Sequence, residues 1–197
     1  MKRLELILIL LLITGITLNL LLISGGGVLT VLSTMSLSLF YAMTGAVLFN
    51  EITLKTLFKS KDAFQNISNR KIVGAALTGI ALSVLITGIL FKVMSWPGAS
   101  PNIYTGLVTS GVILVISVIM YFKKQERFYL GVLKRVVLYC LIGLLLALIP
   151  RVNWMEAIHG KKHPEYIKAY KEYLANPSDD NLWQKVLEEE NKIRDAK

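Results

Sequence analysis

Two histidines come closest to the spacing of a metal site in this sequence. His159 and His163 are four positions apart, so they would face the same side of a helix, as paired metal ligands do. Gly160 and two lysines lie between them, and we find no third ligand nearby. No nucleophile motif or glycine-rich phosphate loop occurs elsewhere. We therefore expect no metal, no cofactor and no catalytic residue.

Carboxylates and histidines are missing from the middle of every long apolar stretch. Glu5 and Glu51 lie at the ends of such stretches, and Lys92 is close enough to an end to extend its amine to the headgroups. An ion-coupled membrane protein usually keeps an ionisable group deep in the bilayer, where the group is costly and persists only for function. The pattern argues against a proton-driven machine built from this chain alone.

Small residues recur at every fourth position in two apolar stretches. They are Ala75, Gly79, Ser83 and Thr87 in one stretch, and Gly106 and Ser110 in the next. Small side chains at this spacing let helix backbones approach closely, so we interpret all six as helix-packing residues. The alternative is a polar pathway for a solute, lined by Ser83, Thr87, Thr109 and Ser110.

The composition is that of a membrane protein. Hydrophobic residues make up 54% of the 197 and charged residues 18%, and the mean hydropathy is +0.56. The net charge of +9 could indicate a nucleic-acid partner, but residues 1–150 hold 13 basic and 4 acidic residues, whereas residues 151–197 hold nine of each. A surplus of cations confined to the apolar part is typical of the positive-inside bias. We therefore expect a lipid bilayer around the chain and no nucleic acid.

Five apolar runs predict an all-α, polytopic membrane protein. Four of them have roughly the twenty residues needed to cross a bilayer: 4–23, 28–49, 72–94 and 103–122. The fifth, 136–149, reaches spanning length only if its helix begins near Tyr129 and lets Lys134 and Arg135 extend to the headgroups. A half-inserted or interfacial helix is the alternative for this run.

The first two pairs of runs look like copies of one hairpin. The string Leu-Ile-Thr-Gly-Ile occurs at residues 12–16 and again at 85–89, and each copy leads through an uncharged turn into a second apolar run. We interpret residues 1–50 and 72–122 as duplicated transmembrane hairpins. A basic loop, 51–71, joins them, and residues 123–150 supply a second basic loop and the fifth helix.

The loops predict the orientation in the membrane. Segments 51–71 and 123–135 carry five cations each, so both belong in the cytoplasm, together with the N-terminus. Five crossings then place the tail in the periplasm. Leu54, Leu57 and Phe58 beside lysines fit a short amphipathic helix on the leaflet, and a solvated basic loop is the alternative.

Residues 151–197 have the composition of a soluble tail with two short helices. His163 and Pro164 begin the first, and Asn176 with Pro177 ends it before the second begins. Two helices of this size bury too little surface to be stable alone, so we expect them to pack on the membrane domain or on a partner. The residues expected to face the partner are Tyr166, Tyr170 and Trp183.

The second hairpin corner carries a specific string, Phe-Lys-Val-Met-Ser-Trp-Pro-Gly-Ala at residues 91–99. Trp96 suits the membrane interface, Pro97 ends a helix and Gly98 permits the reversal. With the residues that follow, 105–110, the string resembles the membrane hairpin of GldL-type proteins. These are inner-membrane motor subunits of the gliding-motility and type 9 secretion machinery of Bacteroidota.

The resemblance implies a related hairpin in an inner-membrane protein of Bacteroidota. The chain departs from the family at Ser95, where a histidine is common, and at residues 109–111, Thr-Ser-Gly, where the family carries a functional glutamate. We therefore expect the scaffold of the family without its proton-binding residue.

These observations lead to one functional hypothesis. The chain is expected to be a small, non-catalytic inner-membrane scaffold or accessory subunit of a bacterial envelope complex, with a membrane or periplasmic protein as partner. Homo-oligomers are compatible with the sequence. The alternative is a small transporter or channel component, and a membrane enzyme ranks third.

Overall fold

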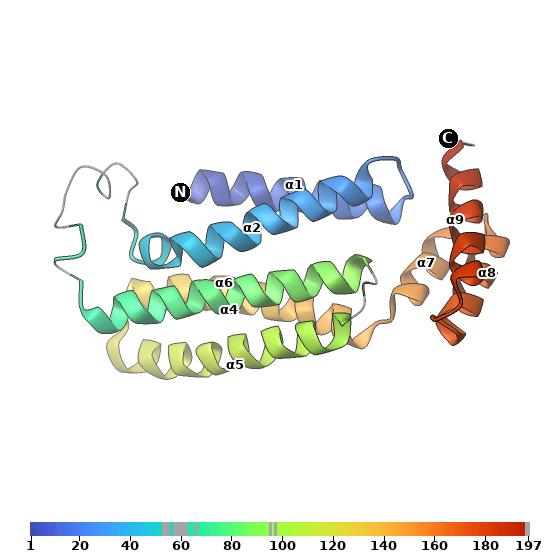
Figure 1. The fold of residues 1–197 in the computed structure, drawn as a ribbon. Coiled ribbons are helices and arrows are strands. Elements are labelled where there is room, and N and C mark those ends of the chain that lie inside the picture. The colour runs from blue at the N-terminus through green and yellow to red at the C-terminus, as the bar shows by residue number, and fades with distance from the viewer. Residues whose placement is uncertain (53–55, 57–62, 66, 95, 97, 196–197) are drawn as a thin grey trace.

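The computed structural model describes residues 1–52, 56, 63–65, 67–94, 96 and 98–195, and every regular element in this part is an α-helix. In chain order the helices are α1 (Lys2–Leu20), α2 (Gly26–Phe49), α4 (Asn69–Met94), α5 (Ala99–Lys124), α6 (Arg127–Leu148), α7 (Arg151–His159), α8 (Pro164–Ala175) and α9 (Asp180–Asp195). The first five form an elongated bundle, and the last three form a smaller group at one end of it (Figure 1). The predicted all-α class is confirmed.

Five helices, α1, α2, α4, α5 and α6, are long and apolar enough to cross a membrane. They contain 19 to 26 residues, so they measure about 28 to 39 Å at 1.5 Å per residue. The fifth apolar run, which the sequence left open, is a continuous helix of 22 residues. The chain is a multi-pass membrane protein, and the prediction of five spans is confirmed.

The bundle is built around α2 and α4. Helix α2 packs against α1 and α4, and α4 packs in turn against α5 and α6. Half of the apolar window is buried in α2 and in α4, against 17 to 22% in the three outer helices. The outer helices therefore present most of their leucine, isoleucine and valine side chains to the lipid. This agrees with their sequences, which are apolar on all sides of the helix.

Each hairpin turns at a glycine in the left-handed conformation, Gly25 or Gly98. Each of these glycines directly precedes the return helix. The backbone hydrogen bonds around them repeat with an offset of 73 positions. Ile23 N donates to Leu18 O and Trp96 N to Phe91 O, both at 2.9 Å. The structure thus places Trp96 and Gly98 at the second corner, whereas Pro97, like Leu54, Leu57 and Phe58 of the predicted amphipathic segment, lies outside the described residues.

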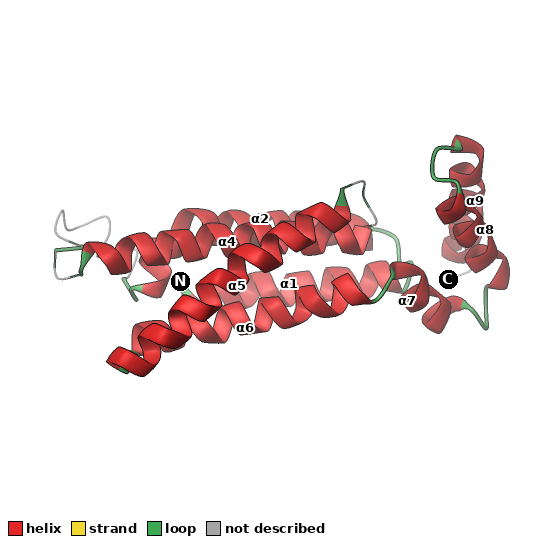
Figure 2. Ribbon diagram, turned by 90° about the horizontal axis from the view of Figure 1, so that it is seen from below, coloured by secondary structure: helices red, strands yellow, loops and turns green. Residues whose placement is uncertain are grey.

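The tail contains three helices rather than the two that the sequence predicts. Pro150 has an extended conformation, so it ends α6 and allows a new helix, α7, to start at the next residue. Figure 2 shows the three tail helices at the end of the bundle opposite the N-terminus. Sequence reasoning missed α7 because its nine residues show no apolar stripe.

The tail is docked on the corner of the first hairpin. Leu22 is 2% exposed and packs among tail residues that include Met155 and Tyr166. Leu22 has a positive φ of 54°, a strained conformation for a leucine that its burial stabilises. In addition, His159 Nε2 lies 2.7 Å from the carbonyl oxygen of Leu20. These contacts make the tail part of the same folded unit as α1.

Two of the residues expected to face a partner lie instead inside the tail. Tyr166 and Tyr170 are 1% and 3% exposed, and their rings stack at 6.1 Å. This differs from the sequence-based expectation, because α7 and Leu22, which the sequence did not place there, cover them. Trp183 is 38% exposed beside Tyr173, with 5.1 Å between the ring centroids.

Candidate functional site

Four polar side chains meet inside the bundle near its N-terminal end. They are Glu5 of α1, Tyr41 of α2, and Arg135 and Tyr139 of α6, named here the Glu5 cluster. The side chain of Glu5 is 9% exposed and that of Arg135 is 19% exposed. Arg135 Nε donates to Glu5 Oε1 at 2.5 Å, and its Nη2 donates to Oε2 at 2.7 Å. The guanidinium therefore holds the carboxylate by both oxygens, the strongest geometry for this pair.

The aromatic residues complete the cluster. The hydroxyl of Tyr41 donates to Glu5 Oε1 at 2.5 Å and lies 3.4 Å from the hydroxyl of Tyr139. The two tyrosine rings meet edge to face, with centroids 5.6 Å apart. The guanidinium of Arg135 lies 5.4 Å from the centre of the Phe49 ring, within range of a cation–π contact. Tyr41 is fully buried.

This geometry is that of a structural tie. A guanidinium keeps its proton, and the carboxylate of Glu5 accepts three hydrogen bonds, two from Arg135 and one from Tyr41, so its charge is well satisfied where it stands. The tie joins α1, which packs mainly on α2, to α6, which packs mainly on α4 and α5. In a bilayer, an unpaired charge left by the loss of one partner would cost several kcal/mol.

Sequence reasoning missed this pairing. Glu5 was expected at a span end, and Arg135 was expected to extend to the headgroups; the structure instead turns both side chains toward each other inside the bundle. One signal could have indicated the pair. Both residues lie near the ends of predicted spans that terminate on the same side of the membrane. Because an unpaired charge is costly in the bilayer, opposite charges at the same depth are expected to pair.

Four of the predicted packing residues lie between α2 and α4. Ala75 and Gly79 border Gly45, where an added Cβ would fall 2.8 Å from Gly79 Cα. Further along, the hydroxyl of Ser38 lies 2.7 Å from that of Ser83 and 3.1 Å from that of Thr87. The close approach and the hydroxyl contacts occur on one face of α4.

The other two packing residues lie between α4 and α5. A Cβ on Gly106 would fall 2.5 Å from Leu85 Cα, and the Ser110 hydroxyl lies 3.4 Å from the carbonyl oxygen of Ala81. Thr109 is exposed and donates to its own helix. The residues of the alternative polar pathway are therefore divided among two helix interfaces and the outer surface, and they do not converge.

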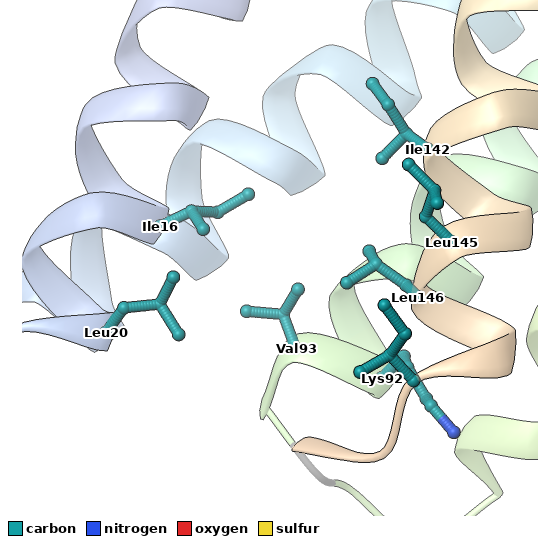
Figure 3. Close-up of a pocket in the computed structure, with 8 residues that line it drawn as sticks. Ile16, Leu20, Lys92, Val93, Ile142, Leu145 and Leu146 are labelled. Carbon is teal, nitrogen blue, oxygen red and sulfur yellow. The ribbon is translucent and has the colours of Figure 1, made fainter. Parts of the chain in front are cut away.

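An apolar groove of about 280 Å³ runs between α1, α4 and α6 near the tail end of the bundle. Ile16 and Leu20 face Ile142 and Leu145 across it, above Val93 (Figure 3). Lys92 borders the groove, but its amine points away from the centre (Figure 3). Apart from Lys92, the lining is aliphatic and offers no group for acid–base or nucleophilic chemistry.

The two histidines lie at the end of α7 and at the N-cap of α8. Nε2 of His159 is engaged with the backbone of α1, and the rings of His159 and His163 are 6.0 Å apart and tilted. Within the described ranges there is no group of three or more histidine, cysteine or acidic side chains that could hold a metal ion.

Comparison with known proteins gives one match. Residues 77–131, from within α4 through α5 to the start of α6, match the family of the GldL N-terminal domain. The resemblance seen in the sequence is confirmed for this stretch. GldL is a component of the gliding and type 9 secretion motor. No curated protein and no solved structure matches the chain.

Proposed function

We propose that this chain, whose α4–α5 hairpin is similar to the GldL N-terminal domain, is a non-catalytic scaffold or accessory subunit of a bacterial inner-membrane complex. The observation that carries the proposal is the chemistry of α5. Its buried polar groups are the hydroxyls of Ser110 and Ser117, and neither can carry charge. The similarity to a motor component, without an ionisable group at this depth, favours a supporting role over a proton-driven one.

The Glu5 cluster supports the same conclusion. Its carboxylate is the buried acid among the described parts of the spans, and Arg135 and Tyr41 occupy its oxygens. A group that passes protons must exchange partners during each cycle. A carboxylate with three hydrogen bonds is suited to holding helices together.

The repeat is a second part of the proposal: α1–α2 and α4–α5 are copies of one hairpin. An added Cβ on Gly15 would meet the backbone of Leu29 and Thr30, and one on Gly88 would meet Asn102 and Ile103. All of these positions correspond with the offset of 73 that also relates Gly25 to Gly98. The two hairpins pack through α2 and α4, so the chain contains its own pair of neighbouring hairpins.

The orientation follows from the charges. The starts of α4 and α6 and the end of α5, which carry Lys71, Lys134 and Lys123, lie at the same end of the bundle as the N-terminus, and the hairpin corners and the tail lie at the other end (Figure 1). The positive-inside bias then assigns the N-terminal end to the cytoplasm and the tail to the periplasm. Trp183, an exposed aromatic residue of the tail, is the proposed contact for a protein partner.

Mild detergent extraction of the tagged chain from its native membrane tests the scaffold role. We expect a second membrane or periplasmic protein to elute with the chain in a fixed ratio through size exclusion. Trp183→Ala should lower that ratio, and Gln184→Ala, an exposed neighbour, should leave it unchanged. Elution of the chain alone would argue against the scaffold.

A small transporter or channel component is the second candidate, favoured by the two hairpins of the same direction. Liposomes that contain the purified chain and a pH-sensitive dye distinguish it. Proton flux that disappears in Glu5→Gln would support transport and overturn the proposed function.

A further inference from the structure

A second concave site opens at the N-terminal end of the bundle, next to the Glu5 cluster. Its volume is about 450 Å³, and it is formed by the starts of α1, α4 and α6 and the end of α2. Five cationic side chains line it, and we name it the basic pocket: Lys2, Lys71, Arg127, Lys134 and Arg135. One acidic residue, Glu51, also lines it. The pocket therefore has an excess of positive charge.

Three of these five cations already have a carboxylate partner. The pairs are Lys2 with Glu51 at 2.6 Å, Lys71 with Glu126 at 2.5 Å, and Arg135 with Glu5. The hydrogen bond from Lys2 lowers the pKa of Glu51 below its usual value, so this acid stays charged at neutral pH and satisfies its lysine. These pairs leave the charge of the pocket on the two remaining cations.

Arg127 and Lys134 have no ion-pair partner among the described residues. They are seven positions apart on α6, so they share one face of the helix. Gly131 lies between them on that face, and a Cβ there would meet only Arg135 Nη1, at 3.9 Å. The floor between the two cations is therefore open space.

The start of α6 adds a further positive contribution. Glu126 at the N-cap makes no side-chain hydrogen bond to the helix, so the first backbone N–H groups of α6 lack a side-chain cap. The N-terminal end of a helix carries partial positive charge and favours anions. Arg127 stands in this first turn, where the dipole and the side chain act together.

The remaining wall of the basic pocket is apolar. Leu48, Ile67 and Leu130 line it beside the cations. The helices that form the pocket begin or end here, and for apolar helices of spanning length this is where the lipid headgroups are expected. A site that is cationic on one side and apolar on the other, at this depth, matches an amphiphile better than a free ion.

We propose that the basic pocket binds the phosphate of an anionic phospholipid headgroup. Arg127 and Lys134 contact the phosphate from either side of Gly131, and Leu48 and Leu130 pack against the first carbons of the acyl chains. The inference is independent of the proposed scaffold function, because it rests on the charge and shape of the pocket and on its position at the ends of the apolar helices.

Retention of lipid by the full-length protein tests the proposal. The purified chain is titrated in neutral detergent with phosphatidylglycerol, and bound lipid is counted by native mass spectrometry. Arg127→Gln combined with Lys134→Gln should weaken binding about tenfold or more. The matched control is Lys123→Gln combined with Lys124→Gln, which removes the same charge from the exposed end of α5 outside the pocket and should change binding little.

A second variant changes the shape and keeps the charge. Gly131→Leu should fill the floor of the pocket and reduce binding, while the helix propensity of leucine protects the fold. An equal loss of lipid binding in the two double variants, or unchanged lipid binding by Gly131→Leu, would overturn the proposal. Soluble glycerol phosphate distinguishes the source of the phosphate: failure to compete at millimolar concentration supports a lipid, and efficient competition overturns the lipid assignment.

Discussion

Gly25 and Gly98, 73 positions apart, adopt the same left-handed backbone conformation, with φ of 80° and 79°. No atom lies within 4 Å of the place where a Cβ on Gly25 would stand, so only its backbone conformation requires glycine. We expect Gly25→Ala to lower the free energy of unfolding by about 1–2 kcal/mol through backbone strain alone. Gly98→Ala should behave in the same way, since its nearest neighbour is 3.5 Å away.

Gly74→Ala is the matched control for this prediction. Gly74 lies within α4, also with no atom within 4 Å, and its φ is helical, so alanine should be neutral or stabilising there. Thermal unfolding in detergent measures all three variants. If all three behave alike, the corner glycines are not needed for their conformation.

Removal of either partner of the Glu5–Arg135 ion pair should destabilise the bundle strongly. Glu5→Ala and Arg135→Ala should each cost about 3–5 kcal/mol, because each leaves a charge unpaired in a nonpolar surrounding. The double variant should cost clearly less than the sum of the two, and Tyr41→Phe about 1 kcal/mol. A double-mutant cycle from detergent unfolding gives these numbers. Additive losses would mean that the two side chains do not interact.

The contact of Gly45 with Gly79 should tolerate no larger side chain. A Cβ on Gly45 would meet backbone atoms of α4, which cannot rotate away. We expect Gly45→Val to cost about 1–3 kcal/mol or more. Gly111→Val, on an open face of α5, is the control and should have little effect. Equal stability of the two variants would contradict a close contact between α2 and α4 at Gly45.

Labelling of single cysteines tests the proposed orientation. In a Cys140→Ser background, Gln184→Cys in the tail should react with a membrane-impermeant maleimide in cells whose outer membrane is permeabilised. Lys123→Cys, exposed at the other end of the bundle, should react only after the inner membrane is lysed. The reverse pattern would place the tail in the cytoplasm.

The sequence predicted what depends on length and composition. The five spans follow from runs of apolar residues. The helix Arg127–Leu148 reaches spanning length although its first turns carry cations, because Arg127 and Lys134 are exposed near its start and Arg135 pairs with Glu5. The corner at Gly98 was also predictable, since a reversal between two apolar helices favours glycine.

Pairing across helices was not predictable in the same way. Apart from the small residues of α4 and α5, whose spacing predicted the faces where these helices pack, the spans are apolar on all sides, so their sequences do not define which face meets a neighbour. The contact of Glu5 with Arg135 depends on the rotation of α1 and α6, and the burial of Tyr166 depends on Leu22 from a distant corner. Such contacts are determined by packing and by the low dielectric of the surroundings, which act only on the assembled bundle.

Helix α1 is tied at both ends to residues that the ribosome adds much later. Glu5, near its start, pairs with Arg135, which is 130 positions further on. Leu20, at its end, contacts His159 through its carbonyl oxygen, and His159 is 139 positions further on. During synthesis, the first hairpin therefore enters the membrane with an unmatched carboxylate and an uncovered Leu22. Nascent chains that stop before α6 would keep the unpaired carboxylate of Glu5 in the membrane and Leu22 exposed. Membrane quality control could recognise incomplete chains by these two features.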